Sequence, residues 1–185
     1  MDDGQIVDLY WARQERAIRE TDQKYGRYCR SIARNILSNE QDAEESVSDT
    51  YLGAWNAMPP HRPAVLQTFL GKLTRRIALK RVRDASREKR GGGEVPLALE
   101  ELAQCIPAAG SVESQVLAQE LSQALNRFLG GLPVRERRVF LRRYWYLDPI
   151  ERIAKELGFT PGKTKSMLYR TRGKLRDFLE KEGLL

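Results

Sequence analysis

The sequence predicts an all-α fold made of two small helical domains joined by a flexible linker. Apolar residues recur at helical spacing along nearly the whole chain, and no segment shows the clean alternation expected of a strand. Three consecutive glycines at 91–93 interrupt that spacing, and a stretch with two prolines and mixed polarity follows. We therefore expect one domain over residues 1–90, a linker over 91–111 and a second domain over 112–185.

Apolar spacing predicts four helices in the first domain. The polar pair Ser38-Asn39 ends the second helix, and Pro59-Pro60 ends the third. Cys29 lies among apolar residues of the second helix, so we expect a buried thiol. The expected ranges are Gln5 to Arg19, Asp22 to Leu37, Glu40 to Ala57, and from after Pro63 to about Lys89.

Composition favours a nucleic-acid partner, because 32 Lys and Arg residues outnumber 25 Asp and Glu residues among 185. The net charge is +7, and 41% hydrophobic residues are enough for packed cores. Acids such as Asp2, Asp3 and Asp8 interrupt the N-terminal segment, so we expect neither a secretory signal nor a membrane-inserted helix, and a cytoplasmic location. Two distant cysteines and a single histidine offer no metal-ligand spacing, and no cofactor is expected.

The most informative segment, Ile150 to Arg176, has the pattern of a helix-turn-helix. Asp148-Pro149 predicts the start of its first helix, with Asp as the cap and Pro at the first helical position. Gly158 is expected to end that helix, and Thr160-Pro161 repeats the start signal for the next one. A simple helical hairpin with a solvated basic face is the alternative.

The second of these helices combines an apolar face with a cationic one, as a helix in the major groove of DNA requires. Met167, Leu168 and Leu175 form the apolar face. The cations come without an acidic residue until Asp177, and they are Lys163, Lys165, Arg170, Arg172, Lys174 and Arg176.

The predicted fourth helix carries a second basic cluster. Nine cations lie between Lys72 and Arg90, opposed only by Asp84 and Glu88. Apolar residues interleave at helical spacing, so one side can pack while the other offers cations to phosphates. A solvated basic face is again the alternative, and an exposed aromatic nearby would suit an unstacked base.

The predicted third helix has the opposite charge. Four acids cluster near its start, Asp42, Glu44, Glu45 and Asp49. An apolar and aromatic stripe follows at helical spacing, made of Val47, Tyr51, Leu52 and Trp55. Such a face could dock a basic partner helix. The alternatives are that the apolar side chains belong to the core and the acids serve the helix dipole. A metal-dependent nuclease site is disfavoured, because no further carboxylate or histidine motif completes it.

Three segments in this order resemble regions two and four of the extracytoplasmic-function sigma factors, the small two-domain initiation subunits of bacterial RNA polymerase. The resemblance covers about Tyr25 to Leu179. The segments are DAEESVSDTYLGAWN, FLGKLTRRIALKRVRD and LPVRERRVFLRRYWYLDPIERIAKELGFTPGKTKSMLYRTRGKLR.

The resemblance implies roles for particular residues. Asp42, Glu45, Asp49 and Trp55 would bind the clamp helices of the largest polymerase subunit. The basic helix would recognise and open the minus-ten element through Lys72, Arg75, Arg76, Lys80 and Arg83. The last helix would read the minus-thirty-five element through Lys163, Lys165, Ser166, Tyr169 and Arg170. The resemblance also implies contact with the flap of the second-largest subunit and an anti-sigma factor.

The basic helix departs from the family pattern W-L-x-x-I-A-x-N-x-x-x-D. Phe69 stands in place of the Trp, Arg76 in place of the Asn and Lys80 in place of the Asp. Arg76 cannot accept a hydrogen bond and Lys80 reverses a charge, so we expect more phosphate contact and a looser base preference here.

The sequence therefore predicts an alternative sigma factor that binds core RNA polymerase and directs promoter-specific initiation, and that is not itself an enzyme. The other hypothesis is a free-standing helix-turn-helix regulator that binds a palindrome as a dimer. That hypothesis leaves the acidic third helix and the basic fourth helix without a role.

Overall fold

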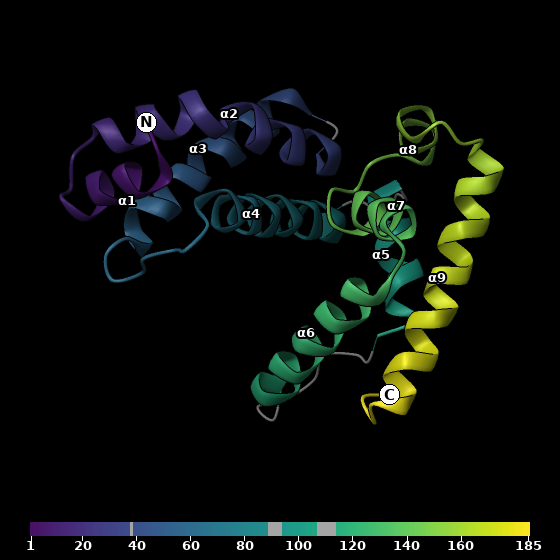
Figure 1. The fold of residues 1–185 in the computed structure, drawn as a ribbon. Coiled ribbons are helices and arrows are strands. Elements are labelled where there is room, and N and C mark those ends of the chain that lie inside the picture. Colours follow the sequence, from purple (N-terminus) through teal and green to yellow (C-terminus); the bar gives the residue numbers. More distant parts are fainter. Residues whose placement is uncertain (38, 89–93, 107–113) are drawn as a thin grey trace. The chain divides into compact units, whose positions relative to one another are not determined.

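A computed structural model confirms the all-α prediction (Figure 1). Nine helices and no strand occur in the described ranges, and none of those helices is long and apolar enough to span a bilayer. The chain divides into two compact units, Met1–Gly91 and Gly92–Leu185. The expected glycine break at 91–93 lies outside the described residues. The structure describes residues 1–37, 39–88, 94–106 and 114–185.

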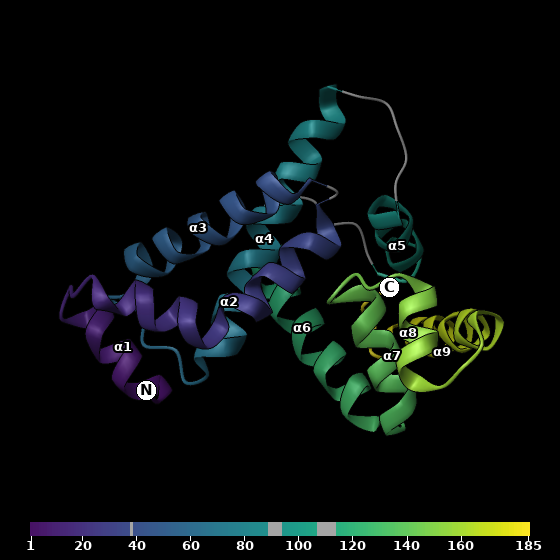
Figure 2. The ribbon, with the colours of Figure 1, turned by 90° about the horizontal axis from the view of Figure 1, so that it is seen from above.

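The first unit is a bundle of four helices around one core (Figure 2). Helices α2, α3 and α4 pack against one another in every pairing, and α1 packs on α2. This arrangement puts α3 and α4, the acidic and the basic helix, side by side. The four helices are α1 (Asp3–Trp11), α2 (Arg16–Ile36), α3 (Glu40–Ala57) and α4 (Leu66–Glu88).

The expected helix from Gln5 to Arg19 is wrong, because the chain turns between α1 and α2. Arg13 adopts a positive φ of 53°. Its guanidinium donates a hydrogen bond to the backbone oxygen of Trp55 at 2.8 Å, and its backbone N–H bonds Tyr10 O at 3.1 Å. A tertiary contact thus accompanies a turn that the apolar spacing did not indicate. The third helix has the expected bounds, and the fourth ends one residue from its expected end.

The core of the first unit includes a few paired hydroxyl groups. The Tyr10 and Thr21 hydroxyls lie 2.9 Å apart, and those of Thr50 and Thr74 lie 3.1 Å apart. Cys29 is fully buried, and this burial raises the pKa of its thiol. The expectation of a buried thiol is confirmed.

The described part of the second unit contains five helices, of which α9 is the longest. Helices α6, α7 and α8 all pack on α9, and α5 packs on α7 (Figure 1). At the centre, the Phe128 ring lies 6.4 Å from Phe140 and 5.6 Å from Phe178. The helices are α5 (Glu94–Ala103), α6 (Ser114–Gly131), α7 (Val134–Tyr144), α8 (Ile150–Leu157) and α9 (Pro161–Lys181).

Helix α5 lies inside the segment that the sequence predicts as a linker, so the expectation of an irregular stretch is wrong there. Pro96 is one of the two prolines that indicate an irregular stretch, but it falls in the first turn of α5, where a missing N–H removes no helical hydrogen bond. Ala98 on this helix and Cys105 just after it are buried. The rest of the predicted linker, 91–93 and 107–111, lies outside the described residues.

Candidate functional site

The turn between α8 and α9 has the geometry of a helix-turn-helix. Gly158 ends α8 in the left-handed region at φ 68°, ψ 35°, and its N–H bonds the oxygen of Ala154. Thr160 caps α9 by accepting a hydrogen bond from the N–H of Lys163 at 3.1 Å, and Pro161 occupies the first helical position. The glycine stop and the Thr-Pro start are confirmed.

The expected cap at Asp148 is wrong. Pro149 flanks α8 without a side-chain cap, and the buried Asp148 carboxylate instead accepts a hydrogen bond from Arg142 Nε at 2.6 Å. Arg152 on α8 lies 3.6 Å from the other carboxylate oxygen. The Asp148 carboxylate thus contacts Arg142 on α7 and Arg152 on α8, and it links the two helices in place of capping α8.

All five predicted DNA-contacting residues on α9 are exposed near its start. Tyr169 is 72% exposed. Four of the five line one hollow, while the ammonium of Lys163 lies 4.6 Å from the centroid of the Phe159 ring. Leu168 and Leu175 on the opposite side of α9 are buried. The residues in the hollow are Lys165, Ser166, Tyr169 and Arg170.

On α4, four of the five predicted minus-ten residues form an exposed stripe. Each of these four residues follows the one before it by about one helical turn, so all four lie on one face of α4. The opposite face of α4 is buried in the bundle through Leu70, Leu73 and Ala78. The basic stripe consists of Lys72, Arg76, Lys80 and Arg83.

Arg75 is not in the exposed stripe. Its side chain is half-buried at the edge of the bundle, and this burial lowers the pKa of its guanidinium. A partly buried guanidinium is less accessible to a DNA phosphate than the exposed cations of the stripe are. Arg75 therefore differs from the sequence expectation in its position.

The acidic residues of α3 are brought together by one cation that the sequence analysis did not single out. Arg81 Nη1 lies 2.8 Å from Glu45 Oε2 and 3.9 Å from Asp42 Oδ1, and its Nη2 lies 2.8 Å from Asp49 Oδ2. The hydrogen bonds to Asp49 and Glu45 raise the pKa of Arg81, and burial opposes this shift. The three carboxylates remain about half exposed. We call Asp42, Glu45 and Asp49 the acidic face.

Trp55 lies off the acidic face. Its ring packs edge-on against Tyr10 with centroids 6.2 Å apart, and the Arg13 guanidinium lies 5.4 Å from its centroid. Leu52, one turn after Asp49 and 57% exposed, instead extends the acidic face. The sequence analysis left Leu52 open between a docking face and the core, and its spacing from Asp49 is the signal that separates it from Tyr51 and Trp55.

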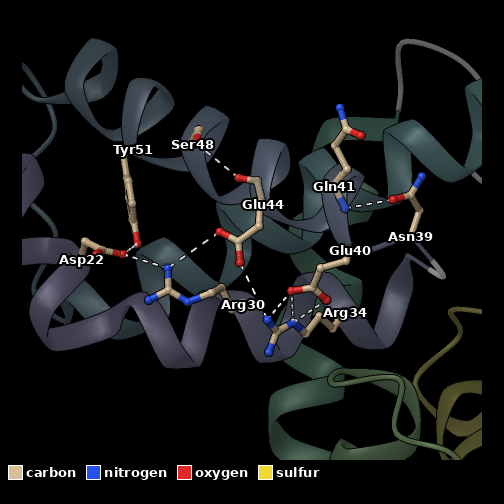
Figure 3. A network of polar contacts seen from close by, with 9 residues as sticks. All are labelled: Asp22, Arg30, Arg34, Asn39, Glu40, Gln41, Glu44, Ser48 and Tyr51. Atoms are coloured by element: carbon tan, nitrogen blue, oxygen red, sulfur yellow. Dashed lines mark hydrogen bonds and ion pairs between the residues drawn. The ribbon is translucent and has the colours of Figure 1, made fainter.

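The other flank of α3 is paired with α2 (Figure 3). Arg30 Nη1 lies 3.1 Å from Asp22 Oδ1 and 3.9 Å from Glu44 Oε2, while the Tyr51 hydroxyl donates to the same Asp22 oxygen at 2.8 Å. Arg34 pairs with Glu40 and lies 3.7 Å from Glu44. Helix α3 is thus held from both sides by arginines.

Two family models match the chain. The family model described as sigma-70 region 2 matches residues 22–88, and that described as sigma-70, region 4 matches residues 122–175. Together the two ranges take in more than half of the chain. The first contains the acidic face and the basic stripe, and the second contains the helix-turn-helix. No curated protein matches the chain.

Proposed function

Because this chain belongs to the extracytoplasmic-function type of the sigma-70 family, we propose that it binds core RNA polymerase and directs initiation at promoters of its own. Sigma factors act in promoter recognition and transcription initiation, and they are regulators of transcription rather than enzymes. The catalytic chemistry belongs to the polymerase in this proposal, and the chain supplies docking and DNA recognition in the bacterial cytoplasm.

The observation that carries the proposal is the separation of charge in the first unit. The acidic face on α3 and the basic stripe on α4 belong to adjacent helices, and Arg81 pairs with the acids where the two helices meet. One such unit can bind a cationic protein surface and a nucleic acid at the same time. A domain that only dimerises has no need of both.

Docking is assigned to the acidic face together with Leu52. Half-exposed carboxylates steer a basic partner toward the surface, and an exposed leucine adds apolar area to bury on contact. In the family this contact is made with the clamp helices of the largest polymerase subunit. Trp55 supports the face from the core side, because it packs on Tyr10 and Arg13.

DNA recognition is divided between α9 and α4. The exposed start of α9 suits the major groove of the minus-thirty-five element, where Lys165 and Arg170 can reach phosphates or base edges and Tyr169 offers its ring and hydroxyl. The basic stripe on α4 suits the minus-ten region, because its lysine and arginine side chains have no acceptor group and favour phosphate contact. Because the two contacts are on one chain, each raises the effective concentration of the other.

The same surfaces would be the targets of an anti-sigma factor. A protein that covers the acidic face would block polymerase docking, and one that covers the start of α9 would block DNA. The flap of the second-largest polymerase subunit is the partner we assign to the second unit, as the family implies.

The test is co-migration with core RNA polymerase on gel filtration. The wild-type chain is expected to co-migrate, and the variant Asp42→Ala/Glu45→Ala is expected to run apart from the polymerase. The matched control is Glu40→Ala/Glu44→Ala, which removes the same charge from the opposite flank of α3 and should still co-migrate. A wild-type chain that stays apart from core polymerase but binds a DNA palindrome as a dimer would favour the free-standing regulator instead.

A further inference from the structure

Helix α5 is fixed to the second unit by the carboxylate of Glu101. The Tyr144 hydroxyl donates to Glu101 Oε2 at 3.0 Å, and Arg172 Nη1 lies 3.3 Å from the same oxygen. Arg172 Nη1 also donates to the Tyr144 hydroxyl at 2.6 Å, and Arg143 Nη2 lies 3.7 Å from Glu101 Oε1. One carboxylate thus joins α5 to α7 and α9.

This cluster is largely removed from water. The side chains of Glu101 and Arg172 are 22% and 17% exposed, and that of Arg143 is 2% exposed. Charged hydrogen bonds are stronger in such surroundings, and a charge left there without its partner is costly. Removal of Glu101 would therefore weaken the docked position of α5, because Arg143 and Arg172 would lose this carboxylate partner.

Arg172 lies beside the residues of α9 that we assign to DNA. It follows Tyr169 by three positions, and its guanidinium carbon lies 6.0 Å from the centroid of the Tyr169 ring. Leu97 and Glu101 of α5 share a hollow of about 430 Å³ with Lys165 and Tyr169. Helix α5 thus lies across this hollow from Lys165 and Tyr169, two predicted DNA contacts, and it places the Glu101 carboxylate near them.

We propose that α5 is an intramolecular brake on DNA binding, in which Glu101 withholds Arg172 from the phosphate backbone for as long as α5 is docked. Glu101 is a positioning residue, because it acts through Arg172. Release of α5 removes a carboxylate from the flank of the recognition helix and frees a cation for DNA. Because coupling is reciprocal, DNA that binds Arg172 must in turn loosen α5.

The inference rests on the proposed DNA-binding role of α9, but the helix that acts as the brake is one that neither family model includes. Helix α5 and Glu101 lie between the matched ranges 22–88 and 122–175.

The first experiment measures the affinity of the full chain for a 30-base-pair duplex of arbitrary sequence at several salt concentrations. Glu101→Ala is compared with Glu100→Ala, because Glu100 is exposed on the same helix and its loss changes the net charge equally. One additional phosphate contact steepens the slope of log K against log salt by about 0.9. The ratio of the two affinities should therefore be about 3-fold larger at 50 mM than at 200 mM salt.

Two results bear on this measurement. The double variant Glu101→Ala/Arg172→Ala should lose the additional slope, because the gain is assigned to Arg172. Equal slopes for Glu101→Ala and Glu100→Ala would overturn the brake.

The second experiment uses Cys105 as a reporter of α5 docking. Cys105 is 6% exposed and its thiol lies 3.7 Å from the Glu101 backbone oxygen, while Cys29 is fully buried in the first unit. Labelling by an aromatic disulfide, with peptide mapping by mass spectrometry, separates the two thiols. Cys105 should react several-fold faster in Glu101→Ala than in Glu100→Ala, and faster in the wild-type chain when the duplex is added. If the duplex leaves the labelling rate of Cys105 unchanged, DNA and Glu101 do not compete for Arg172, and the brake is contradicted.

The two experiments separate failure of the brake from failure of the proposed function. If the wild-type chain and all variants bind the duplex with the same salt dependence, the brake is wrong and the DNA interface stands. If none of them binds the duplex even at low salt, both the DNA interface and the brake that rests on it are wrong.

Discussion

The Arg81 guanidinium on α4 donates to the Asp49 carboxylate on α3 at 2.8 Å. The same side chain reaches Glu45 and Asp42, so one cation from the basic helix holds all three residues of the acidic face. The carboxylates are therefore pre-positioned before a partner arrives. These side chains lose conformational entropy when the unit folds, so less entropy is lost when the partner binds.

Replacement of Arg81 tests this arrangement. Arg81→Ala should lower the free energy of unfolding by roughly 1 kcal/mol, because partly exposed ion pairs each contribute little but three share this cation. The measurement is urea unfolding followed by tryptophan fluorescence. Arg76→Ala removes the same charge from the exposed side of α4 and should cost less. An equal loss in the two variants would contradict the role of Arg81.

Tyr25 should make the first unit sensitive to alkali. Burial, with a hydrogen bond to the Asp3 carboxylate, raises the pKa of Tyr25 from 10.0 to about 12. Because this pKa is raised on folding, the stabilisation is present below pH 10 and is lost as the pH rises toward 12. Tyr25→Phe should therefore lose less stability than the wild-type chain between pH 9 and about 11.5 in urea unfolding. Parallel losses would show that Tyr25 does not titrate in this way.

Gly71 marks a close approach of α4 to α2. A Cβ at this position would lie 2.4 Å from the Tyr28 hydroxyl oxygen and 3.1 Å from two ring carbons. Gly71→Ala should lower the free energy of unfolding by roughly 1–3 kcal/mol, because the ring must move within a packed interface. Gly173→Ala on α9, where a Cβ meets nothing within 4 Å, should instead gain up to about 1 kcal/mol from helix propensity. Thermal unfolding of both variants checks this, and a stable Gly71→Ala would contradict the close contact.

Asp148 should matter for the helix-turn-helix more than a helix cap would. Its carboxylate is buried and accepts a hydrogen bond from Arg142 Nε at 2.6 Å, so Asp148→Ala removes the acceptor of that Nε, while Arg142 keeps its ion pair with Glu156. We expect a loss of roughly 1–3 kcal/mol in urea unfolding of the second unit. Glu151→Ala, in the exposed first turn of α8, is the control. A loss no greater than the control's would be the contrary result.

Helix α3 and the turn of the helix-turn-helix could be predicted from the sequence because local signals decide them. Asn39 and the segment before Pro59 delimit α3, and Gly158 with Thr160 delimits the turn. At these positions the backbone requirement of a cap or a positive φ admits few residue types.

Pairing between helices could not be predicted in the same way. Arg81 and Arg76 look alike in a basic run, and only the packing of α4 on α3 decides that Arg81 meets the acidic face and Arg76 faces solvent. The same is true of Asp148, whose neighbour Pro149 indicates a cap while Arg142 on α7 attracts the carboxylate. Helix α5 was not predicted because proline is common both where a helix is interrupted and in the first turn of a helix, and Pro96 is in a first turn.

The most direct test of the central claim is transcription in vitro by core RNA polymerase from a library of genomic fragments of the source organism, with transcript starts mapped by sequencing. With the chain present, starts should concentrate at a small set of positions that share two spaced upstream elements. The Asp42→Ala/Glu45→Ala variant should lose them, while Glu40→Ala/Glu44→Ala should keep them. A set of starts that is the same with and without the wild-type chain would contradict the account.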